Sequence, residues 1–131
     1  MRNKKLSEWI GIALILIIGI IHVYTSPDEF NDAPYLGIMF VGAFFASIVA
    51  AIGIYRNQPL WGWGTGLLVA LGSMVGYILS RTVGLPISGV EPWGPAIGYL
   101  SLILEFLFVA AFTRTAEFKQ LLAMLTQRKS A

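Results

Sequence analysis

The stretch WGPAIGYLSLILEFLFVAAF, residues 93–112, is apolar along its length except for one acidic residue, Glu105. About 20 apolar residues in a helix cross the roughly 30 Å of hydrocarbon in a bilayer. A carboxyl group at that depth costs at least a few kcal/mol unless other groups pair with it. The stretch therefore predicts a transmembrane helix, with Glu105 facing protein rather than lipid.

Three further stretches have the same character, so the chain reads as an integral membrane protein. Hydrophobic residues make up 56% of the 131 residues and charged residues only 12%, which leaves too little polar sequence to coat a soluble surface. We expect an all-α membrane domain, residues 1–131, in which a bundle of four transmembrane helices spans about residues 9–25, 35–55, 60–81 and 94–113.

A shorter amphipathic segment follows the fourth span, at about residues 115–128. Its apolar residues recur at helical spacing, at Phe118, Leu121, Leu122 and Leu125. We expect a C-terminal cytoplasmic amphipathic helix that lies on the inner leaflet, and a docking helix for a partner protein is the alternative.

The basic residues predict the orientation in the membrane. With four crossings, one side carries the Lys and Arg residues of both ends and of the loop near residue 56, whereas Arg81 alone falls on the other side. The positive-inside rule then places both termini in the cytoplasm, in the cell inner (cytoplasmic) membrane. This bias argues against a dual-topology exporter, and the long first apolar run without a small-x-small site argues against a cleaved signal peptide.

Proline and aromatic residues mark the expected span ends. Pro27 is expected to end the first helix, and the loop at residues 84–95, rich in proline and glycine, is expected to pack as a cap on the outer side. Aromatic residues at the span ends are expected to anchor at the headgroups, namely Trp9, Tyr24, Tyr35, Tyr55, Trp61, Trp63 and Trp93.

Small residues at four-residue spacing predict the faces on which the helices pack, since lipid gives no hydrophobic drive for helix association. In the second span these are Gly42, Ala46 and Ala50, and in the third Gly72, Gly76 and Ser80. The first span offers Gly11 and Gly19 on the face of His22. The fourth span offers Gly94 and Gly98 on the face of Glu105.

Polar residues of three spans are predicted to gather in the outer half of the bundle. The rise of a helix puts Glu105 near mid-bilayer and Ser101 one turn nearer the outside, while His22, Tyr77 and Arg81 lie close to the outer boundary. We expect an outward-facing polar pocket lined by these five residues with Glu105 at its floor. Arg81 is expected to be too shallow to touch Glu105 directly, so that Tyr77, Ser101 or water bridges them.

The roles of the two most unusual residues stay open at this point. Glu105 is consistent with a hydrogen-bonded helix interface, with a cation or proton site, or with pairing to a partner subunit. His22, the one histidine, fits a residue bonded to a carbonyl or water, or a metal ligand with Glu105 and Asp28, which would be a thin metal site. Arg81 fits a boundary residue that snorkels outward or pairs with Asp28, Glu29 or Glu91. It is also consistent with an anion clamp or with a partner of Glu105.

The sequence favours no catalytic or cofactor motif. It has no cysteine, no glycine-rich phosphate loop and no spaced metal cluster, and no basic tract that would suit a nucleic acid. We therefore expect no enzyme activity, no cofactor, and as partners the lipid bilayer with other membrane subunits or a second copy. The favoured function is a small subunit or accessory protein of a membrane complex. The alternative is an oligomeric transporter or channel for a cation, proton or small solute that uses Glu105.

Two strings resemble a family of small four-span membrane proteins of bacteria and archaea. They are HVYTSPDEFNDAPYLG at residues 22–37 and GYILSRTVGLP at residues 76–86, and the pattern EPW at 91–93 followed by Glu105 is similar to the same group. The resemblance implies a shared outer-face architecture and no assigned activity.

Overall fold

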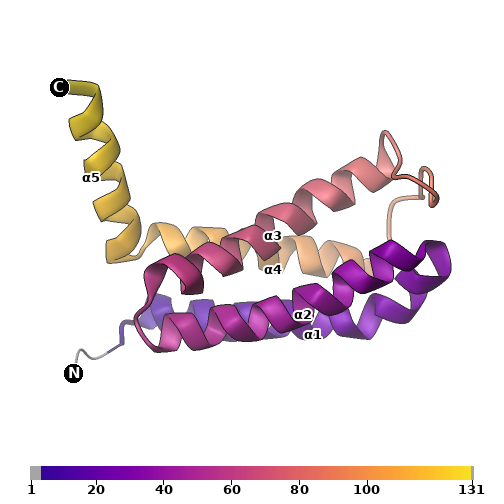
Figure 1. Ribbon diagram of the computed structural model, residues 1–131, viewed down its shortest axis with the longest axis horizontal. Helices are drawn as coiled ribbons and strands as arrows, with labels where there is room; N and C mark the ends of the chain where they lie inside the picture. Colours follow the sequence, from indigo (N-terminus) through magenta and orange to yellow (C-terminus); the bar gives the residue numbers. More distant parts are fainter. Residues whose placement is uncertain (1–3, 131) are drawn as a thin grey trace.

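The computed structural model describes residues 4–130, with side chains for residues 4–127, and it is all-helical (Figure 1). The helices are α1 (Leu6–Asp32), α2 (Pro34–Tyr55), α3 (Pro59–Arg81), α4 (Ala96–Thr113) and α5 (Ala116–Ser130). Helices α1 to α4 are each long and apolar enough to cross a membrane, as predicted. The basic side chains of Arg2, Arg128 and Lys129, used above for the orientation, lie outside the described residues.

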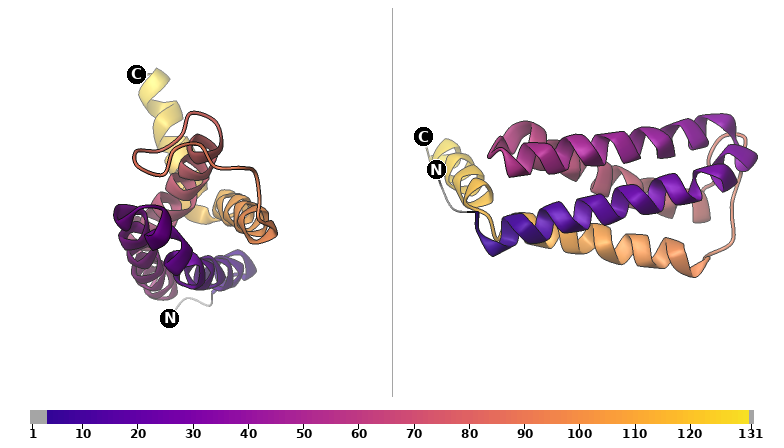
Figure 2. Two further views of the ribbon diagram at one scale, coloured as in Figure 1. Left: turned by 90° about the vertical axis from the view of Figure 1, so that its right-hand side faces the viewer. Right: turned by 90° about the horizontal axis from the view of Figure 1, so that it is seen from below.

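The four long helices form a ring in which each packs against two others. Helices α1 and α3 both contact α2 on one side and α4 on the other (Figure 2). The end that carries Ala33 and residues 82–95 is called the loop end below. The opposite end, called the terminal end, holds the 56–58 turn, the start of α1 and all of α5 (Figures 1 and 2).

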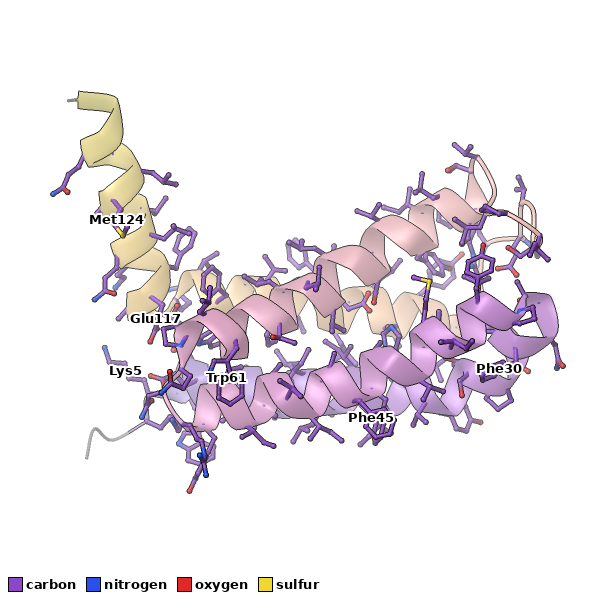
Figure 3. The ribbon with its side chains drawn as sticks, in the orientation of Figure 1. Lys5, Phe30, Phe45, Trp61, Glu117 and Met124 are labelled. Carbon is purple, nitrogen blue, oxygen red and sulfur yellow. The ribbon has the colours of Figure 1, made fainter. Side chains whose placement is uncertain are left out.

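The hydrophobic core fills the half of the bundle nearer the terminal end. Trp63 is 2% exposed, and its ring lies against Phe108, with ring centroids 5.2 Å apart. Glycines make room for both rings, since a Cβ at Gly11 would meet Trp63 and one at Gly66 would meet Phe108. The prediction that Trp63 anchors at the headgroups is therefore wrong, because this indole is a central core residue. Phe45 of α2, by contrast, points away from the bundle and is 59% exposed, as a lipid-facing residue would be (Figure 3).

Helix α1 is longer than predicted, because Pro27 lies inside it rather than after it. A proline leaves the carbonyl four residues earlier without its helical N–H donor, here the carbonyl of Val23. The hydroxyl of Ser26 donates to that carbonyl at 2.8 Å. Ser26 thus satisfies the carbonyl that the proline leaves unpaired. The helix continues to Asp32, and the connection between the first two spans is the single residue Ala33.

Helices α2 and α3 are closest at the terminal end and diverge toward the loop end (Figure 1). At Gly53 and Gly62 the two backbones meet, and a Cβ on Gly62 would lie 2.5 Å from the backbone nitrogen of Ile54. Nearer the loop end, a Cβ added to Gly42, Gly72 or Gly76 would meet nothing within 4 Å. The prediction that these three glycines pack against neighbouring helices is therefore wrong.

Helix α5 leaves the terminal end and is steeply inclined to the bundle axis (Figure 1). The hydroxyl of Thr115 accepts the backbone N–H of Phe118 at 3.2 Å and so caps its first turn. Phe118 packs on Phe112, but Leu121, Leu122 and Leu125 are each 45% exposed or more, so the rest of the apolar face is uncovered within the chain. This geometry agrees with the predicted amphipathic helix.

Candidate functional site

A cavity of about 810 Å³ occupies the half of the bundle nearer the loop end. All four long helices and the 82–95 loop contribute to its lining, which is mainly apolar. The five residues predicted for the polar pocket all line it, namely His22, Tyr77, Arg81, Ser101 and Glu105. Pockets that hold small organic ligands have volumes of about 300–1,000 Å³. The cavity is therefore of a size that suits a ligand rather than a single ion.

His22 of α1 is buried and oriented by its own helix. Its Nδ1 lies 2.8 Å from the carbonyl oxygen of Ile18, which can only accept, so Nδ1 carries the hydrogen. In the neutral ring Nε2 is then an acceptor, and the Ser73 hydroxyl of α3 lies 3.0 Å from it. The ring of Phe40 on α2 packs on the imidazole, with centroids 5.0 Å apart. His22 thus presents a hydrogen-bond acceptor to the interior of the cavity.

Glu105 of α4 meets this histidine at the deepest point of the cavity. It is 1% exposed, and its Oε2 accepts a hydrogen bond from the Ser101 hydroxyl at 3.1 Å. The same oxygen lies 3.9 Å from Nε2 of His22. Polar side chains of α1, α3 and α4 therefore converge at one point. We call His22, Ser73, Ser101 and Glu105 the polar floor.

Arg81 lies at the mouth of the cavity and is held there by the 82–95 loop. Its guanidinium donates to Oε2 of Glu91 at 3.0 Å and to the carbonyl of Gly94 at 2.7 Å, and it stacks over the ring of Tyr77. Its Nε has no hydrogen-bond partner among the described residues. The Tyr77 hydroxyl in turn accepts the backbone N–H of Gly94 at 3.3 Å. Arg81 and Tyr77 thus fix the loop over α3, as the expected cap requires.

The mouth carries more acid than base. Asp28, Glu29 and Asp32 from the last turns of α1 and Glu91 from the loop line it, together with Arg81. Burial raises the pKa of Glu91 to about 7, and a hydrogen bond and the negative charge of Asp32 add to the rise, although Arg81 opposes it. The turns of α1 beyond Pro27, where the sequence predicts that the helix has ended, place Asp28, Glu29 and Asp32 here.

The cavity also reaches the side of the bundle, between α2 and α3. Its lining includes Met39 of α2 and Leu68 of α3, which are 62% and 74% exposed, as well as Gly42, Gly72 and Gly76. The hydroxyl of Tyr35 on α2 donates to the carbonyl of Pro86 at 2.7 Å and bounds this opening at the loop end. The Gly53–Gly62 contact bounds it at the terminal end. We call this opening the lateral window.

The predicted residues fall into two groups within one cavity. Glu105, Ser101 and His22 share the polar floor, whereas Arg81 and Tyr77 share the mouth. Ser73, which contacts His22 directly, was not among the predicted site residues. Its position four residues before Tyr77 and eight before Arg81, on the same helical stripe, was the signal that could have placed it there.

Among the described residues there is no group of three or more His, Cys, Asp or Glu that could hold a metal ion. Comparison with protein families, curated proteins and solved structures finds no match. The resemblance of the outer strings to four-span proteins therefore stays a prediction.

Proposed function

We propose that this chain is a non-catalytic multi-pass membrane protein that binds a small molecule in its cavity, as a binding protein or as an accessory subunit of a membrane complex. The observation that carries this proposal is the cavity of about 810 Å³, which is mainly apolar and ends on a few convergent polar groups. That combination is the usual form of a small-molecule site. A polar floor deep in an apolar bundle is expensive, which favours a functional role for it.

In this proposal the loop end faces outward and both termini are cytoplasmic, in the inner membrane. The distribution of Lys and Arg supports that orientation. Single cysteines at positions 30 and 89 should react with a membrane-impermeant thiol reagent in intact cells or spheroplasts. Reaction at these positions only after the cytoplasmic membrane is permeabilised would reverse the orientation.

Binding is favoured over catalysis by the surroundings of Ser73. The 3.0 Å contact between its hydroxyl and Nε2 of His22 is the geometry of a nucleophile and its base. Acyl transfer also needs donors that stabilise an oxyanion, which are often backbone N–H groups. Ser73 lies in the interior of α3, where the backbone N–H groups are used by the helix. The carbonyl of Ile18, rather than a carboxylate, orients the imidazole.

The test is to purify the protein from its native membrane in a mild detergent and to identify the small molecules that remain bound. Gly72→Phe should abolish the bound molecule, because Gly72 lines the cavity and a side chain there meets open space. Gly64→Phe is the matched control, since Gly64 is equally open but is not part of the cavity lining. If no defined small molecule remains bound to wild type or to either variant, a binding function is refuted.

The same purification distinguishes a subunit from a stand-alone binding protein. The uncovered apolar face of α5 and the lipid-facing helices offer surface for partners of either kind. Defined membrane proteins that copurify in constant ratio support the accessory-subunit form. A single species in several mild detergents, still carrying its small molecule, supports the stand-alone form.

The second candidate, an oligomeric transporter or channel, is favoured by one observation, the buried carboxyl of Glu105 beside His22. Within one chain the way beyond Glu105 is filled by core residues such as Phe108 and Trp63, both nearly inaccessible. A pathway would therefore have to run between subunits. Ion or proton flux in liposomes that is lost in Glu105→Gln would support transport. Equal background flux for wild type and variant would exclude it.

A further inference from the structure

We propose that the ligand is an amphipathic amine, whose ammonium group binds at the polar floor and whose hydrocarbon chain passes through the lateral window into the outer leaflet. This inference rests on the binding function proposed above and adds the chemical class and the route. Three independent features of the cavity carry it, namely the balance of charge in the lining, the acceptors at the floor and the shape of the window.

The charge of the lining favours a cation. Arg81 is the only Lys or Arg among the lining residues, and its guanidinium is engaged by Glu91 at 3.0 Å. Against it stand four further acidic residues, which are Asp28, Glu29, Asp32 and Glu105. This excess of acidic groups favours a positively charged ligand over a carboxylate or phosphate.

The polar floor offers the acceptors that an ammonium group needs. Oε2 of Glu105 and Nε2 of His22 are 3.9 Å apart, a separation that one nitrogen donor can bridge with N–H bonds to both when the Ser73 hydroxyl turns away from Nε2. The hydroxyl oxygens of Ser73 and Ser101 adjoin these two atoms and can accept as well as donate. A primary ammonium group has three N–H donors, so this floor suits it better than an alcohol with one.

The lateral window suits a hydrocarbon chain. Three glycines, Gly42, Gly72 and Gly76, leave space where side chains would otherwise close the gap between α2 and α3. Met39 and Leu68 flank this space and are largely exposed, so in a membrane they border lipid. A ligand whose head lies at the floor can therefore keep its chain among lipid chains, without transfer of apolar surface into water.

The test measures the binding of dodecylamine, dodecanol and dodecanoate to the purified full-length protein in a nonionic detergent, by native mass spectrometry and thermal unfolding. The three probes share one chain length and differ in the head group. Dodecylamine should bind on the order of tenfold more tightly than dodecanol, since a charged hydrogen bond is stronger than a neutral one. Dodecanoate should bind more weakly than either.

Substitutions then test the binding of the head group and the route of the chain separately. Glu105→Gln should reduce the affinity for dodecylamine to the level of the affinity for dodecanol. The affinity for dodecanol should change little. Gly72→Leu should abolish the binding of both, whereas Gly64→Leu, outside the cavity lining, should leave it unchanged. The probe series on the unmodified protein keeps the head-group test decisive if Glu105→Gln does not fold.

Each contrary result identifies the step that fails. Equal affinity for the three probes would overturn the amine assignment and leave the binding function standing. A preference for dodecylamine that persists in Gly72→Leu would overturn the lateral route. Binding of dodecanoate above dodecylamine would assign the site to an anionic lipid instead. A native molecule that copurifies while no probe binds would refute this inference alone, whereas the absence of both would refute the binding function.

Discussion

Replacement of Gly62 by alanine should destabilise the bundle, although alanine is the better helix former. Gly62 lies where α3 crosses α2 at the terminal end. A Cβ there would lie 2.5 Å from the backbone nitrogen of Ile54 and 2.6 Å from the carbonyl carbon of Gly53. Both atoms belong to the backbone of α2, so no side chain can rotate away. The two helices must separate instead.

The size of the effect follows from that separation. Carbon atoms in contact prefer about 3.5–4.0 Å, so α2 and α3 must move apart by about 1 Å. Insertion of a methyl group into such a packed contact costs about 1–3 kcal/mol. Gly64, two residues along the same helix, provides the reference, because a Cβ there meets nothing within 4 Å. Gly64→Ala should stabilise by up to about 1 kcal/mol, which is the difference in helix propensity.

The assay is reversible unfolding of wild type, Gly62→Ala and Gly64→Ala in mixed micelles with increasing denaturing detergent. Comparison of the two variants removes the shared gain in helix propensity. The free energy of unfolding of Gly62→Ala should be about 1–3 kcal/mol lower than that of Gly64→Ala. If Gly62→Ala is as stable as Gly64→Ala or more stable, the Gly53–Gly62 contact does not hold α2 against α3 and the reasoning is refuted.

Three further predictions concern the core, the mouth and the floor. Trp63→Ala should lower the free energy of unfolding by about 3–5 kcal/mol in the same assay, because the indole is 2% exposed, and a loss below about 1 kcal/mol would contradict this. The folded protein holds the Glu91 proton more firmly than the unfolded chain, since its pKa rises from 4.5 to about 7. The contribution of Glu91 to the free energy of unfolding is therefore full below pH 4.5 and is lost as the pH rises through about 7. Glu91→Gln should reduce the dependence of the free energy of unfolding on pH in this range, and an unchanged dependence would contradict the prediction. Glu105→Leu should keep or raise stability in detergent but lose ligand binding, because leucine avoids the desolvation of a buried carboxyl, and a loss as large as that of Trp63→Ala would contradict this.

Much of the bundle could be predicted because a bilayer demands long apolar helices. Helices α2 and α3 begin and end within one residue of the predicted 35–55 and 60–81, at prolines and polar turns that the sequence displays. The end of α1 could not be predicted from its proline alone. A helix that continues through Pro27 needs another donor for the carbonyl of Val23, and the rotamer of Ser26 that supplies it is not visible in the sequence.

The candidate site could be predicted in its members but not in its shape. Helical spacing and depth placed His22, Ser101 and Glu105 on inward faces, and the structure brings them to one cavity. Spacing could not show that Gly72 and Gly76 line a window rather than a contact, because a row of small residues is compatible with either. The difference lies in the path of α3 relative to α2, which depends on contacts distant in sequence.

Those contacts explain why the cavity is there. Gly53 and Gly62 bring α3 against α2 at the terminal end, while the ring of Tyr77 packs on Gly98 and draws the other end of α3 toward α4. Helix α3 therefore leans away from α2, and the hydrogen bond from Tyr35 to Pro86 joins α2 to the 82–95 loop across the gap. An enclosed dry cavity would cost about 24 cal/mol per Å³, but this cavity of about 810 Å³ is open at the mouth and at the lateral window, so that water and lipid can enter it. In a membrane the cavity therefore borders water at the mouth and hydrocarbon at the window. A single amphipathic molecule with a cationic head supplies both kinds of contact at once.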